Sequence, residues 1–137
     1  LTNKLNIPFE YNKLSRLFVS SFNLNTEVFN IVKNLYQNYN CLIASDNYQE
    51  LVDYIKDKYD FNKYFKIMVF SNNMGIRKKQ ASFFQEIVDN YNPNECIYID
   101  DKEEPLKIGK SIGFNTIQFK DIEQLKKKLA SFSIKID

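Results

Sequence analysis

Histidine is absent from the 137 residues of this chain, and cysteine is scarce. Without histidine, neither a Ser-His-Asp triad nor a metal site built on imidazole is available. The two cysteines, Cys41 and Cys96, each begin an apolar stretch. We interpret them as small buried hydrophobic residues in a reducing compartment, rather than as a disulfide or a metal-binding pair.

Strong net charge and long apolar runs are missing as well. The formal net charge of +2 is too small to indicate nucleic acid or an anionic membrane as a partner. No apolar run approaches the roughly 20 residues of a membrane span, and no signal-peptide pattern opens the sequence. With 44% hydrophobic and 26% charged residues, the composition is that of one ordinary globular domain. We therefore expect a cytoplasmic protein with no nucleic-acid or membrane partner.

The most informative stretch of the sequence is the apolar run that begins at Cys96 and ends in Asp100 and Asp101. The run is short and lacks a period, which predicts a buried strand, and the carboxyl ends of such strands are where α/β sheets bind ligands. Two adjacent carboxylates repel each other, and a cation such as Mg²⁺ between them relieves that repulsion. The alternative is that Asp101 caps the following helix, which would carry Glu103 and Glu104 in its first turn.

Strand and helix patterns alternate along the chain. This alternation predicts a three-layer α/β/α domain of the Rossmann-like type, with a parallel sheet and right-handed crossovers. Apolar residues at helical spacing favour helices over residues 10–22, 25–36, 48–58, 80–91, 103–112 and 122–129, and short apolar runs favour strands over residues 41–44, 67–70, 96–99 and 114–119.

Two further groups follow predicted strands. Ser45, with Asp46 and Asn47, ends the 41–44 strand, and Lys78 follows the 67–70 strand after a loop. Alone, such a serine is usually a turn or capping residue and such a lysine is usually a solvated charge. Together with Asp100 and Asp101 they place a hydroxyl, an ammonium and two carboxylates at one sheet edge. That set suits phosphoryl chemistry, in which catalysis is mostly positioning and charge compensation.

The order Ser45, Lys78, Asp100-Asp101 resembles the haloacid dehalogenase (HAD) superfamily over about residues 25–129. Ser45 matches the second family motif, Lys78 the third and the acid pair the fourth. The resemblance implies that Ser45, Asp46, Asn47 and Lys78 bind the phosphoryl substrate and compensate its charge. It also implies that Asp100 ligates Mg²⁺ with Asp101 in support.

The same resemblance divides the chain. Residues 1–24 are similar to the remnant of a helical cap, as in the branch with 2-haloacid dehalogenases and sugar-phosphate phosphatases. Residues 25–137 are similar to the α/β core without its first strand. The family's first motif, an Asp-x-Asp nucleophile, is missing, and Ser20-Ser21 cannot replace it because serine forms no aspartyl-phosphate. Lys79 and Pro105 also depart from the family's usual Pro and Asn.

Two interpretations follow. In one, the chain is a fragment or truncated form of a Mg²⁺-dependent phosphatase for small phosphomonoesters, inactive as written. In the other, it is a non-catalytic binding or regulatory module. The partners expected are a small phosphorylated metabolite, and the missing N-terminal segment of the same protein or a second chain.

The absent strand of the resembled fold would lie between residues 41–44 and 96–99. We predict that these two strands do not close on each other, that the gap stays open or is filled, and that the thiols stay free. The alternating segment Phe132–Ile136 is a candidate to fill it.

Overall fold

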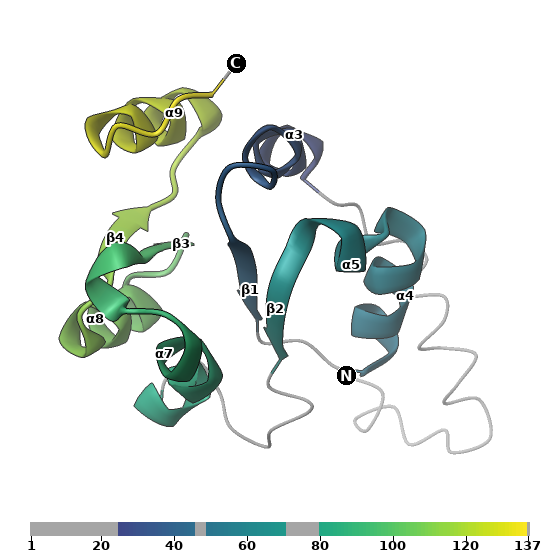
Figure 1. Ribbon diagram of the computed structural model, residues 1–137, viewed down its shortest axis with the longest axis horizontal. Helices are drawn as coiled ribbons and strands as arrows, with labels where there is room; N and C mark the ends of the chain where they lie inside the picture. The colour runs from purple at the N-terminus through teal and green to yellow at the C-terminus, as the bar shows by residue number, and fades with distance from the viewer. Residues whose placement is uncertain (1–24, 46–48, 71–79, 137) are drawn as a thin grey trace, which may run out of the picture.

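The structure is a computed structural model that describes residues 25–45, 49–70 and 80–136. The predicted 10–22 helix and the proposed cap remnant lie outside these ranges. Helices and strands alternate as the sequence predicts (Figure 1). The elements in order are α3 (Thr26–Leu35), β1 (Cys41–Ser45), α4 (Gln49–Tyr59), α5 (Phe61–Tyr64), β2 (Phe65–Phe70), η1 (Ala81–Phe84), α7 (Gln85–Asn90), η2 (Pro93–Glu95), β3 (Ile97–Asp100), α8 (Glu103–Ile112), β4 (Asn115–Gln118) and α9 (Ile122–Ser131).

The strands form two separate pairs. β1 pairs in parallel with β2, placing Ser45 opposite Phe70, and β3 pairs in parallel with β4, placing Asp100 opposite Gln118. Each pair is a two-stranded sheet of its own among the described residues. Figure 1 shows the two pairs side by side, with β1 and β3 facing each other. The predicted parallel α/β fold is confirmed, and β1 and β3 do not close on each other.

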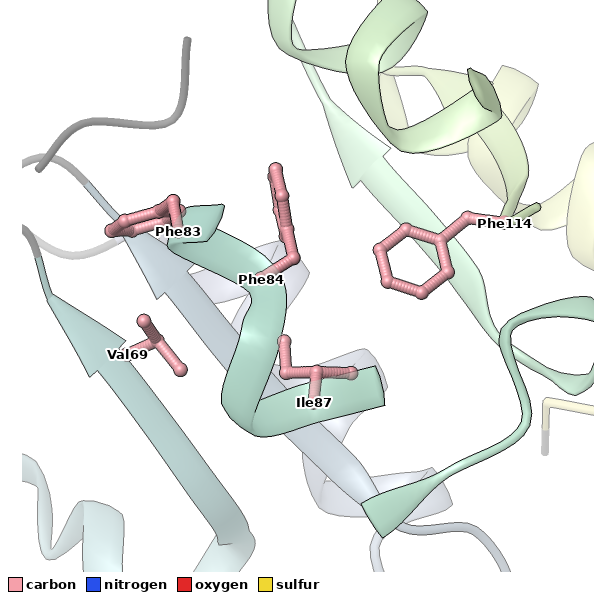
Figure 2. Packing of buried hydrophobic residues seen from close by; sticks show 5 residues of the cluster. All are labelled: Val69, Phe83, Phe84, Ile87 and Phe114. Atoms are coloured by element: carbon pink, nitrogen blue, oxygen red, sulfur yellow. The ribbon is translucent and has the colours of Figure 1, made fainter. Parts of the chain in front are cut away.

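One face of both sheets is covered by η1, α7 and α8. Phe83 and Phe84 are completely buried there, and Figure 2 shows the Phe84 ring between Phe83 and Phe114. The Phe84 ring meets Phe83 and Phe114 edge-on, with ring centroids 5.4 and 5.7 Å apart. Alternate residues of β1, among them Leu42, pack into this cluster. The cluster therefore contains residues of both strand pairs and packs the two pairs against the same helices.

The other face is covered by α3, α4, α5 and α9. Ile43 of β1 packs beneath Phe29, Leu51, Ile55 and Phe61, while Ile117 of β4 packs with Ile31, Leu125 and Leu129. Because α3 contributes residues to both clusters, it lies over both strand pairs. Buried on both faces, the strands form the middle of three layers.

Local signals explain the helix boundaries. The Asn25 side chain accepts a hydrogen bond from the Val28 amide at 3.1 Å and caps α3. The carboxylate of Asp121 caps α9 through the Gln124 amide at 2.8 Å. Gly113, at φ +116°, ends α8 in the left-handed region that glycine tolerates.

Two expectations differ from the structure. The predicted 80–91 helix begins as the 3-10 turn η1 before α7, and Phe83 and Phe84 are both buried in this turn. The segment Phe132–Ile136, named above as a candidate to fill the gap, is not a strand and does not fill it. The Ile134 amide donates to the Leu129 carbonyl at 3.0 Å, which turns the chain back at the end of α9. Ile134 and Ile136 then pack on the Leu125–Leu129 cluster, because that contact buries apolar surface without a sheet.

Candidate functional site

Asp100 is the buried polar residue at the carboxyl end of β3. Its side chain is only 8% exposed. Oδ2 accepts a hydrogen bond from the Tyr98 hydroxyl at 2.8 Å, and Oδ1 accepts one from the Lys102 amide at 2.9 Å. These two donors fix the carboxylate, since Tyr98 lies two residues earlier on the same face of the strand. The sequence did not lead us to expect Tyr98 as an orienting residue, although its i, i+2 spacing to Asp100 was the available signal.

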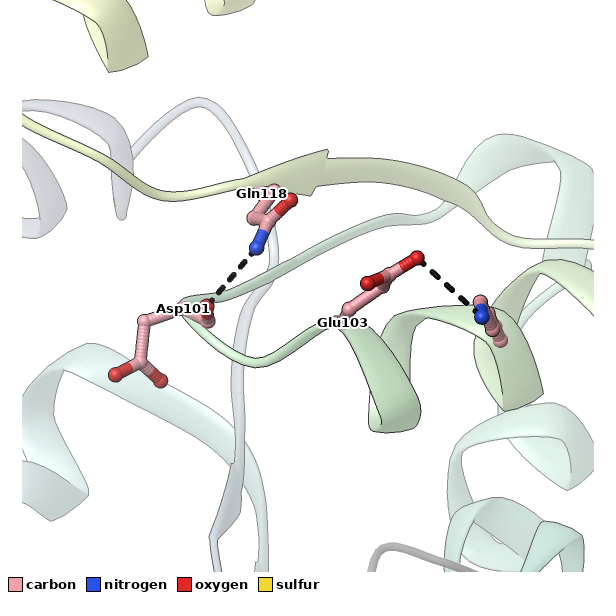
Figure 3. A network of polar contacts seen from close by, with 4 residues as sticks. Asp101, Glu103 and Gln118 are labelled. Carbon is pink, nitrogen blue, oxygen red and sulfur yellow. Dashed lines mark hydrogen bonds and ion pairs between the residues drawn. The ribbon is translucent and has the colours of Figure 1, made fainter.

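Asp101 has a different environment. It is exposed, and its main-chain carbonyl accepts a hydrogen bond from the Gln118 amide at 3.2 Å. Figure 3 shows its carboxylate pointing away from Gln118. The N-cap position of α8 is Lys102, without a side-chain cap. The structure therefore does not support the alternative that Asp101 caps the helix, and its carboxylate remains available to a ligand.

Ser45 is the last residue of β1 and is half-buried. Because parallel strands of an α/β fold present their carboxyl ends at one edge, its position agrees with the predicted edge site. Asp46, Asn47 and Lys78 lie outside the described residues. The substrate-binding and catalytic roles of Ser45, Lys78, Asp100 and Asp101 remain predictions.

The donor set of this edge suits a hard cation in part. Carboxylate oxygens are the ligands that Mg²⁺ prefers, and Asp100 and Asp101 supply carboxylates at this edge. Over the described ranges, however, no group of three acidic, cysteine or histidine side chains gathers at one point. The residues present therefore fit part of a magnesium site, one that needs further ligands.

A cavity of about 160 Å³ lies between the two facing strands. Its walls come from β1 and β3, and its floor comes from the aromatic cluster. The lining residues are Leu42, Ile43, Ala44, Phe84, Ile87, Cys96, Ile97, Tyr98, Ile99 and Phe114. Ile99 is left 39% exposed beside it.

Both thiols are free, as predicted, and both have a raised pKa. Burial raises the pKa of the Cys41 thiol. Burial, and after it the nearby Glu95 carboxylate, raises the pKa of the Cys96 thiol. A raised pKa leaves little reactive thiolate at neutral pH, which agrees with the interpretation of these cysteines as small, partly buried structural residues.

The sequence matches the model of the haloacid dehalogenase-like hydrolase family over residues 2–119. The chain belongs to that family. The resemblance read from Ser45, Lys78 and the acid pair is thereby confirmed at the level of family and fold.

A curated relative is flavin mononucleotide hydrolase 1 of Arabidopsis thaliana, 30% identical over 95 residues. The match covers 68% of this chain but only 39% of the relative. This HAD-family chain thus spans about two fifths of that protein's length.

Solved structures show the same fold. A HAD family enzyme of Bacteroides thetaiotaomicron, in complex with magnesium and inorganic phosphate, matches with a TM-score of 0.75 at 16% identity, over 90% of this chain and 68% of that chain. The putative HAD-hydrolase YfnB of Bacillus subtilis, bound to magnesium, matches with a TM-score of 0.73 at 17% identity, over 87% of this chain and 61% of that one.

The described part of this HAD chain contains no helix with the length and apolar character that crossing a membrane requires.

Proposed function

We propose that this chain carries the greater part of the active site of a Mg²⁺-dependent phosphatase for small phosphomonoesters, and that the nucleophilic carboxylate comes from a strand outside the described residues. The observation that carries the proposal is the fixed, buried carboxylate of Asp100 at the end of β3. Burying a carboxylate costs free energy unless the carboxylate is hydrogen-bonded or paired with a cation. A cation-binding role therefore explains why a carboxylate lies at this position. The flavin mononucleotide hydrolase supports a phosphate monoester as substrate.

Each residue has a distinct role in this proposal. Asp100, with Asp101 in support, would hold Mg²⁺, which when bound offsets the charge of the phosphoryl group. The Ser45 hydroxyl donates a hydrogen bond to a phosphoryl oxygen, and the Lys78 ammonium compensates the charge that develops there. Asp46 and Asn47 contact the rest of the substrate. None of these groups attacks phosphorus. These residues would therefore bind and polarise the phosphoryl group without completing the reaction.

The test uses isothermal titration calorimetry to measure binding of inorganic phosphate in the presence of Mg²⁺. We expect weak, saturable binding that Ser45→Ala, Lys78→Ala and Asp100→Asn each reduce several-fold. Ser131→Ala and Lys128→Ala are matched controls on α9, and they should leave binding unchanged. The proposal would be overturned if the chain bound no phosphate. It would also be overturned if the three site variants bound phosphate as well as the two control variants do.

A non-catalytic binding or regulatory module is the second candidate. The observation that favours it is the absence, within the described residues, of a third carboxylate beside the acid pair. Such a module would bind phosphate in the same titration. It would gain no hydrolytic activity when a strand with a nucleophilic carboxylate is supplied.

A further inference from the structure

Gln118 joins the end of β4 to the loop that carries the acid pair. Its side-chain amide donates a hydrogen bond to the main-chain carbonyl of Asp101 at 3.2 Å. Because the acceptor is a carbonyl oxygen, the Gln118 atom that faces it must be the amide nitrogen. One residue earlier in the loop, the Asp100 carbonyl accepts a hydrogen bond from the Phe119 amide at 2.9 Å. The Gln118 side chain therefore extends the link between β3 and β4 past the end of the strand, as far as Asp101.

The contact reaches the main chain of Asp101 and not its carboxylate. Figure 3 shows the Gln118 amide on one side of this residue and the carboxylate pointing away from it. A ligand of the carboxylate and the Gln118 amide would thus use different atoms. Gln118 can therefore fix the position of Asp101 without competing with a bound cation.

Gln124, in the first turn of α9, fixes the strand end from which Gln118 extends. Its Nε2 donates to the Gln118 carbonyl at 2.8 Å, and its Oε1 accepts a hydrogen bond from the Lys120 amide at 3.1 Å. One donor contact and one acceptor contact define the orientation of this side chain. The main chain of Gln124 is held as well, because its amide donates to the Asp121 carboxylate that caps α9. A continuous series of hydrogen bonds therefore leads from α9 to Asp101.

The glutamine contacts are not what docks α9 on the sheet. Leu125 and Leu129 of α9 are 1% and 2% exposed, and they pack with Ile117 of β4. Burial of two leucine side chains contributes more free energy than an exposed hydrogen bond does. In a purely structural role the Gln118 amide would therefore be almost dispensable. Its contact with the acid-pair loop indicates a role at the candidate site.

We propose that Gln118 is a positioning residue for the magnesium site, and that Gln124 acts through it. Gln118 holds the main chain at Asp101 in the geometry that brings the carboxylates of Asp100 and Asp101 to one cation. The proposal rests on the proposed function, which assigns these two carboxylates to Mg²⁺, and it adds residues that touch neither metal nor substrate. Groups that orient metal ligands change the affinity of a site although they are not ligands themselves.

The experiment uses the full chain and the variant Gln118→Met, which keeps the length of the side chain and removes its amide. Hydrogen exchange of the Lys102 amide reports on the loop, because this amide donates to the Asp100 carboxylate at 2.9 Å. An NMR titration of the same amide with MgCl₂ measures the affinity for the metal. Gln85→Met is the matched control, since it removes another exposed glutamine contact, the one with Asp89 at 2.8 Å on α7.

We expect Gln118→Met to speed exchange of the Lys102 amide and to weaken Mg²⁺ binding about two- to tenfold, the change that loss of one net hydrogen bond produces. Gln85→Met should change neither quantity. Gln124→Met should weaken binding less than Gln118→Met does. Combining the two should cause no further loss, because Gln124 acts through Gln118.

The proposal would be overturned if Gln118→Met bound Mg²⁺ as tightly as the parent chain, or if its Lys102 amide exchanged at the parent rate. Equal losses of affinity in Gln118→Met and Gln85→Met would show only a general loss of stability and would overturn it as well. A parent chain that bound no Mg²⁺ would contradict the proposed function itself, and the positioning role would fall with it.

Discussion

The hydroxyl of Tyr98 donates a hydrogen bond to Oδ2 of Asp100 at 2.8 Å, and the ring of Tyr98 packs edge-on against Phe84 with centroids 5.2 Å apart. One side chain thus ties the candidate site to the main aromatic cluster. Orientation of the carboxylate therefore depends on the packing beneath the sheet.

Tyr98→Phe separates these two roles. The ring contacts with Phe84 stay, and the hydrogen bond to a charged acceptor is lost, so we expect a loss of about 1–3 kcal/mol in the free energy of unfolding. Urea denaturation measures it. Tyr39→Phe removes a hydroxyl from an exposed tyrosine and should change stability by less than about 0.5 kcal/mol. Equal effects in the two variants would show that the Tyr98 hydroxyl contributes nothing.

Gly109 marks a close approach between α8 and the sheet. A Cβ at this position would lie 2.8 Å from Cδ2 of Tyr98 and 3.2 Å from Cδ2 of Phe114. Both rings are packed, so Gly109→Ala should cost about 1–3 kcal/mol through overpacking. That cost outweighs the gain of about 1 kcal/mol in helix propensity. Lys110→Ala, on the exposed side of the same helix, is the control for propensity alone. A Gly109→Ala variant more stable than the parent would contradict the close packing.

The two cysteines should react slowly with iodoacetamide at pH 8, because a raised pKa leaves a small thiolate fraction. Glu95 contributes to the raised pKa of Cys96, so Glu95→Gln should lower that pKa and speed alkylation of Cys96. We expect a modest increase in the alkylation rate, because burial is a larger cause of the raised pKa than Glu95. Cys41 in the same chain, and the Glu86→Gln variant, are the controls. Peptide mass spectrometry measures both rates, and an unchanged Cys96 rate would exclude the Glu95 contribution.

Magnesium should bind the isolated chain weakly. Asp100 and Asp101 supply few hard ligands, so we expect a dissociation constant no tighter than about the millimolar range. Isothermal titration with MgCl₂ measures it, and Asp121→Asn is a control at a carboxylate that caps α9. Micromolar binding that Asp100→Asn abolishes would show that the site is already complete.

Much of the fold follows from local patterns. Apolar periodicity identified α3, α4, α8 and α9, and short apolar runs identified the four strands, because both signals depend on which faces are buried. The η1 turn could not be predicted, because tertiary packing of Phe83 and Phe84 decides its geometry.

The candidate site was only partly predictable. Asp100 and Ser45 stand where strand ends were expected, since a carboxylate or hydroxyl after an apolar run is visible in the sequence. The fixing of Asp100 by Tyr98 and the exposure of Ile99 depend on side-chain contacts that no local pattern encodes. The strand-like alternation of Phe132–Ile136 was misleading, because the segment buries its isoleucines against α9 instead.

The most direct test of the account is hydrolysis of an aryl phosphate with Mg²⁺, by the chain alone and with two strand peptides. One peptide carries Asp-x-Asp after its apolar core, and the other carries Asn-x-Asn. The account predicts no turnover by the chain alone or with the Asn peptide, and turnover with the Asp peptide that Asp100→Asn removes, because only that peptide supplies a carboxylate nucleophile. Equal binding of both peptides, measured by anisotropy, separates strand addition from catalysis. Turnover by the chain alone, lost on Asp100→Asn and Lys78→Ala, would contradict the account.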